Sequence, residues 1–342
     1  MKKILLVSDT WTPQVNGVVT TWKNVINHAE KRNIEFEIIH PYLFRNFAWP
    51  FYKEIGIPVV SYKTIKKRIE RINPDFIHIA TEGILGWHTR KFCNSKNIPF
   101  TTTYHTKFPE FLKSLYSIPE SFTYKIEKIF HSSAANILVN TPTMKKDLTS
   151  RGFQNLIEWT RGVDRDIFNP SKDIVLKKEL DPSKGKKIII YVGRVSKEKN
   201  LYEFCKISEK KDDYQLVIVG DGPIKEKLEK SFPKIIFAGY KFGEELAKYY
   251  STADCCVFPS ISDTFGNTII ESMACGTPVA AFPVNGPVDI IKKSISGYCD
   301  SDLIFAIEKS LKCEEQDVIK SVDKYNWDRC VEILLESLKS SK

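Results

Sequence analysis

Short apolar runs rich in Ile and Val recur along this chain between amphipathic stretches, and they do so in two successive sets. A buried parallel strand needs an apolar run of this length, and the amphipathic stretch after it fits a helix that covers the sheet. The pattern therefore predicts an α/β protein with two Rossmann-like, doubly wound parallel-sheet domains facing across a cleft. We expect strands at residues 3–8, 36–40, 76–79, 100–104 and 136–139 in the first half, and at 187–192, 215–219, 234–238, 255–258 and 278–282 in the second.

The domain organisation follows from length and from a polar break in the middle. The 342 residues, 42% of them hydrophobic, are enough for two cores. Residues 164–187 form a lysine-rich polar stretch that contains Asn169-Pro170, Asp181-Pro182 and Gly185, a composition that favours turns. We expect an N-terminal acceptor domain at 1–168 and a C-terminal nucleotide-sugar donor domain at 169–325. Residues 326–342 should form a terminal helix that docks on a domain and crosses back to the first, because apolar residues recur there at helical spacing: Val331, Leu334, Leu335 and Leu338.

Charge restricts the partners without fixing them. The net charge of +9 favours polyanions, which include nucleic acid, anionic lipid headgroups and phosphorylated substrates, and it is also consistent with a merely solvated basic surface. No arginine-rich arm or nucleic-acid module is present, so we expect no nucleic-acid partner. The aromatic and basic stretch 107–128 is compatible with an anionic membrane surface or with core and rim. Oligomeric state leaves no trace in the sequence.

Cysteine usage and the absence of long apolar runs point to the cytoplasm. The eight cysteines are scattered and show no CxxC spacing, so we expect neither a metal site nor disulfides. The first strand follows directly on Met1 without signal-peptide features, and no run approaches the ~20 residues of a membrane-spanning helix. We expect a cytoplasmic protein, either free or peripheral on the inner face of the membrane.

In doubly wound sheets the ligand lies beyond the carboxyl ends of the strands, so the loop after 187–192 is informative. Gly193 permits a tight turn, and Arg194 and Lys199 are two cations that suit a diphosphate. A solvated lysine-rich loop is the alternative for this segment taken alone.

The loop after 255–258 contains Asp263 and Glu271 on either side of a predicted strand-to-helix turn. Gly266 opens the backbone at the helix start, where amides can face an anion. The carboxylate of Glu271 suits the cis-diol of a ribose. We therefore assign donor binding also to the residues between them, which are Thr264, Phe265, Gly266, Asn267 and Thr268.

Strand ends in the first half supply further candidates. Asn16 and Gly17 precede a predicted helix, where backbone can approach a phosphate, although they are also compatible with a purely structural loop. His105 can contact a sugar hydroxyl or cap local backbone. For an acceptor the candidates are Asp9, Glu82 and Tyr104.

Two lookalikes are set aside. Gly220-Asp221-Gly222-Pro223 lacks the third glycine of a dinucleotide fingerprint, so we interpret it as a strand-to-helix turn. Asp300-Ser301-Asp302 resembles a metal-binding carboxylate pair but lies near a predicted surface turn.

Taken together, these segments resemble glycosyltransferase family 4 (group 1), the retaining GT-B enzymes. The resemblance spans almost the whole chain, and the segments that carry it are Asn16-Gly17-Val18, Tyr104-His105-Thr106, Arg161-Gly162-Val163-Asp164, Gly193-Arg194 with Glu198-Lys199, and Phe265-Gly266 with 271–279. It implies that Arg194 and Lys199 hold the donor diphosphate and that Glu271 holds the ribose. It further implies that Asp263 faces the donor sugar with the amides of Phe265, Gly266 and Asn267, that Gly17 lies near the phosphates, and that His105 lies near the outer sugar hydroxyls. Arg194, Lys199, His105 and Asp263 are then the catalytic set.

One departure from the family matters for specificity. Asp263 stands where most members have glutamate, one methylene longer, and this variant is similar to sulfoquinovosyl and mannosyl transferases and to bacterial glycolipid synthases. Residues 12–19 and 79–83 resemble members that glycosylate diacylglycerol.

The resemblance implies transfer of a hexose (glucose, glucuronate, galactose or mannose) from a UDP- or GDP-sugar to a lipid such as diacylglycerol, with no metal or cofactor required. The alternatives are a polysaccharide or phosphoinositide acceptor, a sugar-nucleotide epimerase, and a non-catalytic basic binding protein.

Overall fold

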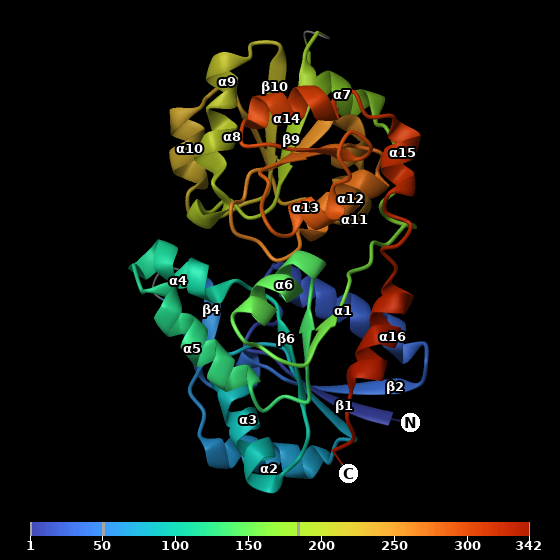
Figure 1. Cartoon of the computed structure of the whole chain (residues 1–342). Coiled ribbons are helices and arrows are strands. Elements are labelled where there is room, and N and C mark those ends of the chain that lie inside the picture. The colour runs from blue at the N-terminus through green and yellow to red at the C-terminus, as the bar shows by residue number, and fades with distance from the viewer. Residues whose placement is uncertain (1, 50–51, 183–184, 342) are drawn as a thin grey trace. The chain divides into compact units, whose positions relative to one another are not determined.

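The chain folds as two compact units, and the computed structural model describes residues 2–49, 52–182 and 185–341 (Figure 1). Unit 1 comprises Met1–Gly162 together with Trp327–Lys342, and unit 2 comprises Val163–Asn326. Contacts between residues therefore place the domain boundary between Gly162 and Val163, whereas the sequence composition placed it between residues 168 and 169. Each unit contains a six-stranded sheet in which all the assigned strand pairings are parallel.

The sheet of unit 1 has the order β2-β1-β5-β6-β7-β8. Its strands are β1 (Lys2–Val7), β2 (Ile34–Ile39), β5 (Phe76–Ile79), β6 (Thr101–Tyr104), β7 (Asn136–Val139) and β8 (Leu156–Glu158). A separate antiparallel hairpin follows β2 and is formed by β3 (Asn46–Trp49) and β4 (Tyr52–Pro58).

Helices cover both faces of this sheet, because successive strand residues point to opposite sides. Leu5 and Val7 pack into one apolar cluster, and Ile4 and Leu6 pack into another. The second cluster includes α16 (Trp327–Ser337), the last helix of the chain, which lies beside α1 (Figure 1). The other helices of unit 1 are α1 (Gly17–Glu30), the 3₁₀ turn η1 (Pro41–Leu43), α2 (Tyr62–Ile72), α3 (Ile84–Lys96), α4 (Phe108–Tyr116), α5 (Glu120–His131) and α6 (Pro142–Ser150).

The sheet of unit 2 has the order β11-β10-β9-β12-β13-β14. Its strands are β9 (Lys187–Val192), β10 (Tyr214–Val219), β11 (Ile236–Gly239), β12 (Cys255–Phe258), β13 (Val279–Ala281) and β14 (Gly297–Cys299). Its helices are α7 (Ile174–Leu180), the 3₁₀ turn η2 (Lys197–Lys199), α8 (Leu201–Cys205), α9 (Ile207–Lys210), α10 (Lys225–Ser231), α11 (Gly243–Thr252), α12 (Asn267–Ala274), α13 (Pro287–Ile290), α14 (Leu303–Ser310) and α15 (Glu315–Lys320).

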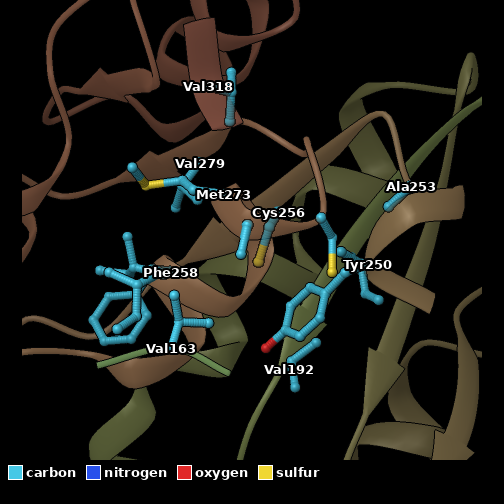
Figure 2. Close-up of a cluster of buried hydrophobic side chains, with 14 of the residues drawn as sticks. Val163, Val192, Tyr250, Ala253, Cys256, Phe258, Met273, Val279 and Val318 are labelled. Atoms are coloured by element: carbon cyan, nitrogen blue, oxygen red, sulfur yellow. The ribbon is translucent and has the colours of Figure 1, made fainter. Parts of the chain in front are cut away.

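The larger core of unit 2 lies between its sheet and the α11–α12 side. Figure 2 shows Val192 and Cys256 of the strands together with Tyr250 of α11 and Met273 of α12 in this cluster. Tyr250 is fully buried, so its ring belongs to the core while its hydroxyl needs a polar partner. That partner is part of the candidate site.

All ten predicted strands are present, and the fold class is confirmed. The short edge strands β8 and β14 and the β3–β4 hairpin were not predicted. The expectation of turns throughout 164–187 was wrong, because α7 forms there. The Asp173 carboxylate caps it by accepting from Val175 and Leu176 N–H, and Leu180 packs into the core. All eight cysteines are free thiols. Among the described residues, no helix is both long and apolar enough to cross a bilayer.

Candidate active site

Each sheet has a point at which the strand order reverses, and loops leaving that point diverge and open a crevice for ligands. In unit 2 it lies between β9 and β12, since the chain proceeds from β9 to β10 on one side and from β12 to β13 on the other. In unit 1 it lies between β1 and β5. The predicted donor residues follow β9 and β12, so the fold of unit 2 brings them together.

The loop after β9 is held by a buried tyrosine that the sequence interpretation did not single out. Tyr191 is 2% exposed, and its hydroxyl donates to the Arg194 carbonyl oxygen at 2.8 Å. A Cβ at residue 193 would lie 2.8 Å from that hydroxyl, and Gly193 has a φ of +147°. Glycine at 193 therefore allows both the backbone turn and the hydrogen bond that fixes Arg194.

Lys199 and Asp263 form the central ion pair of the site. Lys199 Nζ donates to Asp263 Oδ2 at 2.6 Å, and the two side chains are 29% and 17% exposed. Burial by itself would lower the pKa of Lys199, but the Asp263 carboxylate outweighs it and the net effect raises that pKa. Arg194 opposes the increase, which indicates that its positive charge is close by. The cations Arg194 and Lys199 thus share the switch point with the carboxylates of Asp263 and Glu198.

The loop after β12 turns into α12 through Gly266, which has a φ of +96°. Gly266 is the N-cap and has no side chain to cap the helix, so the first-turn amides depend on other partners. Phe265 is buried and its ring packs edge-on against Tyr325, with 5.7 Å between the centroids. Phe265 therefore anchors the loop through its ring. Thr264 is also buried, whereas Asn267 and Thr268 are partly exposed.

Glu271 lies on the next turn of α12, where the fully buried Tyr250 contacts it. The Tyr250 hydroxyl donates to Glu271 Oε2 at 3.1 Å. Burial raises the pKa of Glu271 to about 7, although the hydrogen bond from Tyr250 favours the charged form. The carboxyl group therefore changes charge near neutral pH, and Tyr250 biases it toward the carboxylate. No sequence pattern indicated this tyrosine.

The turn at Gly220–Pro223, which was not assigned to the site from the sequence, packs against the loop that carries Arg194. A Cβ at Gly220 would lie 1.9 Å from the Gly193 carbonyl oxygen, and Val195 N–H donates to the Asp221 carbonyl oxygen at 2.8 Å. The glycine at 220 is needed for this close approach of the loops after β9 and β10.

In unit 1, Asp9 has a structural role at the switch point. Its carboxylate accepts from the N–H groups of Leu85 at 2.8 Å and Gly86 at 3.2 Å, and from the Thr81 hydroxyl at 3.1 Å. A Cβ at Gly83 would meet the Asp9 carboxyl carbon at 2.3 Å, so the glycine leaves room for this cap of α3. Burial raises the pKa of Asp9 to about 6, although these hydrogen bonds oppose the change.

Asn16 caps α1, and its Oδ1 accepts from the N–H groups of Val18 at 3.1 Å and Val19 at 3.0 Å. Gly17 is the first residue of that helix and is exposed, so its backbone is accessible to a ligand.

His105 lies inside a cluster of tryptophan and arginine side chains and is 7% exposed. Trp22 Nε1 donates to His105 Nε2 at 3.0 Å, and Arg161 Nη2 lies 3.2 Å from Nδ1. Burial and then the Arg161 charge hold the pKa of His105 well below its ordinary value, so the ring is neutral. Both ring nitrogens face internal partners, and contact with a sugar stays a prediction.

The two remaining acceptor candidates also have partners within the fold. The buried Tyr104 hydroxyl donates to Glu127 Oε2 at 2.7 Å. Glu82 Oε1 lies 3.2 Å from His131 Nε2, and the Glu82 side chain is 17% exposed. Glu82 lies in the loop after β5, beside the switch point of unit 1, and its carboxylate is partly exposed.

A cavity and a capped helix among the described residues lie apart from this site. A cavity of about 330 Å³ opens near Asp254 and Pro278, which precede β12 and β13, and thus at the opposite edge of the sheet. No cluster of His, Cys, Asp and Glu suited to a metal ion occurs in the described ranges. Asp302 is the N-cap of α14 and accepts from Ile304 and Phe305 N–H.

Comparison with known proteins identifies the family of this chain. Residues 15–167 match the family model described as Glycosyltransferase Family 4, and residues 173–340 match that of Glycosyl transferases group 1. A GDP-mannose-dependent alpha-mannosyltransferase from Corynebacterium glutamicum is 30% identical over 316 residues, which cover 86% of this chain and 76% of that protein. This chain belongs to the group 1 glycosyltransferases.

Two further proteins resemble this glycosyltransferase, one in sequence and one in structure. The alpha-monoglucosyldiacylglycerol synthase of Streptococcus pneumoniae is 27% identical over 90% of this chain and 78% of that protein. The sucrose-phosphate synthase of Thermosynechococcus elongatus superposes with a TM-score of 0.81 at 20% identity, and the match covers 98% of each chain. The second likeness confirms the GT-B fold.

Proposed function

We propose that this glycosyltransferase moves a hexosyl group from a UDP- or GDP-sugar to a hydroxyl of a membrane lipid, with diacylglycerol as the first candidate acceptor. The observation that carries the donor half is the pair of cations, Arg194 and Lys199, beside the partly exposed Asp263 at the switch point of unit 2. A relative named GDP-mannose-dependent supports a nucleotide-sugar donor, and one named as a diacylglycerol glycoside synthase supports the acceptor.

The two cations supply what the bond-breaking step requires. Cleavage of the anomeric carbon–oxygen bond leaves the electron pair on an oxygen of the departing nucleoside diphosphate. Arg194, Lys199 and the amides at the start of α12 stabilise that charge more as it develops, and this difference between ground and transition state lowers the barrier. On donor binding, Lys199 exchanges part of its contact with Asp263 for the phosphate.

The carboxylates orient the rest of the donor. Glu271 accepts from the ribose hydroxyls, and its position beside Tyr250 supports this role. Asp263 accepts from a hydroxyl of the donor sugar. The acceptor hydroxyl attacks the anomeric carbon from the face that the diphosphate leaves, and its proton passes to the departing phosphate oxygen. The configuration is then retained, and the protein need not supply a base.

We propose that no divalent metal is required, because Arg194 and Lys199 provide the positive charge that a metal would otherwise supply to a leaving phosphate. Turnover should be unchanged by a chelator. Loss of turnover in the chelator and its return with a divalent ion would contradict this part of the proposal.

The test is incubation with a panel of UDP- and GDP-sugars, each with diacylglycerol in detergent or with a water-soluble sugar acceptor, followed by mass spectrometry. A hexosyl diacylglycerol, formed together with the nucleoside diphosphate, is the expected product. A product only with the soluble acceptor would overturn the lipid assignment. Conversion of the donor sugar without any acceptor would instead indicate an epimerase. Arg194→Ala, whose turnover should be about a hundredfold lower, serves as the low-activity control.

A further inference from the structure

The outer face of α5 is apolar where a helix in water is normally polar. Phe122, Ile126 and Ile129 are 59%, 39% and 56% exposed. Their spacing of four and three residues places them in one stripe along the helix. The opposite face is occupied by side chains that are buried in unit 1, among them Tyr124 and Phe130. The helix thus has a second apolar stripe beyond the one that its own fold uses.

This exposure belongs to the folded state, because α5 is tied down at both ends. Arg90 of α3 donates to the carbonyl oxygens of Phe130 at 2.8 Å and Ile129 at 2.7 Å. At the other end, Lys113 Nζ of α4 lies 2.8 Å from Glu120 Oε1. A contiguous group of large apolar side chains in water is unfavourable and usually marks a contact surface.

The charges beside the stripe have one sign. Lys125 and Lys128 are both exposed, and Lys128 Nζ also donates to the Arg151 carbonyl oxygen at 3.4 Å. The two acidic residues of α5 do not offset them there, since Glu120 pairs with Lys113 and Glu127 is buried on the inner face. An apolar stripe flanked by lysines is the pattern of a helix that lies on an anionic lipid surface.

Two other segments of the described residues differ from α5 in this respect. The outer face of α2 carries Lys63, Lys67 and Arg71, but its Ile65 and Ile69 are buried. At the start of α7, Ile174 and Val175 are 72% and 66% exposed and lysines lie nearby, but Leu176 packs against the core of unit 2, so the exposed apolar pair does not extend along the helix. The first segment has the charge without the apolar stripe, and the second has the charge with only two exposed apolar residues in its first turn.

We propose that the outer face of α5 is the surface by which unit 1 docks on a membrane with anionic headgroups. The inference rests on the proposed function, in which the acceptor is a membrane lipid, and it names the part of the protein that meets the bilayer. Phe122, Ile126 and Ile129 enter the interface between headgroups and acyl chains, while Lys125 and Lys128 remain at the level of the phosphates.

The test is co-sedimentation of the full chain with phosphatidylcholine vesicles, with and without phosphatidylglycerol. The wild-type protein should bind the anionic vesicles and lose affinity as salt is added. The triple variant Phe122→Ser/Ile126→Ser/Ile129→Ser should bind tenfold or more weakly, because its apolar stripe is gone. Lys125→Gln and Lys128→Gln should each weaken binding about fivefold at low salt.

The matched control is Ile174→Ser/Val175→Ser, which removes comparable exposed apolar area from unit 2 and should bind as the wild type does. Absence of binding of the wild-type protein to either kind of vesicle would overturn the proposal. Equal binding by the α5 triple variant would do so too, as would an equal loss in the α7 control. Circular dichroism of each variant checks that the substituted surface positions leave the fold intact.

Transfer to detergent-dispersed diacylglycerol separates this proposal from the proposed function. The triple variant should keep that activity, since detergent presents the acceptor without a bilayer. Transfer to lipid with unchanged vesicle binding in the triple variant would overturn only the docking surface. Stripe-dependent vesicle binding without any transfer to lipid would overturn only the acceptor assignment.

Discussion

The strand-end loops of the two units are built from similar polar residues and use them in different ways. In unit 1, Asp9 caps α3 and the His105 ring faces Trp22 and Arg161 inside the fold. In unit 2, Lys199 and Asp263 pair with each other while both side chains keep part of their surface in solvent. Polar groups at these strand ends of unit 1 thus mainly hold the scaffold, whereas the ion pair at the switch point of unit 2 stays partly exposed to solvent.

The largest effect that can break this comparison is loss of the unit 2 cations. Arg194→Ala and Lys199→Ala should each lower the turnover number about a hundredfold or more, because one lost donor to a developing anion typically costs ~3 kcal/mol. Steady-state kinetics with a saturating nucleotide-sugar measures this. The matched control is Lys197→Ala, an exposed lysine of the same loop, which should keep near-normal turnover. Equal losses at all three positions would mean that general basicity, and not this geometry, matters.

A smaller effect, on stability, is expected at Asp9. Asp9→Ala removes the acceptor for two N–H groups at the start of α3 and should lower the free energy of unfolding by ~1 kcal/mol or more. All six tryptophans belong to unit 1, so intrinsic fluorescence during urea unfolding follows this unit.

Asp9→Asn is the control for that experiment, because it keeps a side-chain oxygen and should lose less stability. A loss of turnover in Asp9→Ala without any loss of stability would place Asp9 in contact with substrate and contradict the contrast between the units.

The smallest expected effect is a pH dependence at Glu271. Its pKa is raised to about 7 by burial, so the carboxyl group is largely protonated below that pH and is then a weaker acceptor for ribose hydroxyls. The KM for the donor should increase as the pH falls through 7, and Glu271→Gln should remove this dependence.

Tyr250→Phe sharpens the same prediction. The hydroxyl that it removes favours the charged carboxylate, so the pKa should rise further and the increase in KM should begin at a higher pH. Tyr249→Phe, on the adjacent position of α11, should leave the profile in place. A shift toward lower pH in Tyr250→Phe would contradict the assigned hydrogen bond.

The sequence was sufficient for the fold class and for the position of the donor loops, because both depend on local patterns. Ile- and Val-rich runs mark buried parallel strands wherever they occur, and Gly193 and Gly266 mark turns that follow such strands. The edge strand β14 is only three residues long, and its pattern is too brief to stand out. In the polar stretch 164–187, α7 forms with a side-chain cap from Asp173 and with Leu176 and Leu180 packed on the core.

The supporting residues of the site were not predictable, because their roles depend on contacts between segments far apart in the chain. Tyr191 and Tyr250 look like ordinary apolar positions until their hydroxyls are seen to bond Arg194 and Glu271. Gly83 looks like a loop glycine, but its purpose is to leave room for Asp9, 74 positions earlier. Pairings of this kind are fixed by sheet topology and carry no local signal.

The most direct test of the central claim is the binding of the nucleoside diphosphate itself. In calorimetric titrations with UDP and with GDP, we expect the wild type to bind one of the two nucleotides. Lys197→Ala should bind that nucleotide with the same affinity. Arg194→Ala and Lys199→Ala should bind it tenfold or more weakly, since a charge-assisted hydrogen bond contributes ~1.5–3 kcal/mol. Unchanged affinity in both of these variants would contradict the claim that the switch point of unit 2 holds the donor diphosphate.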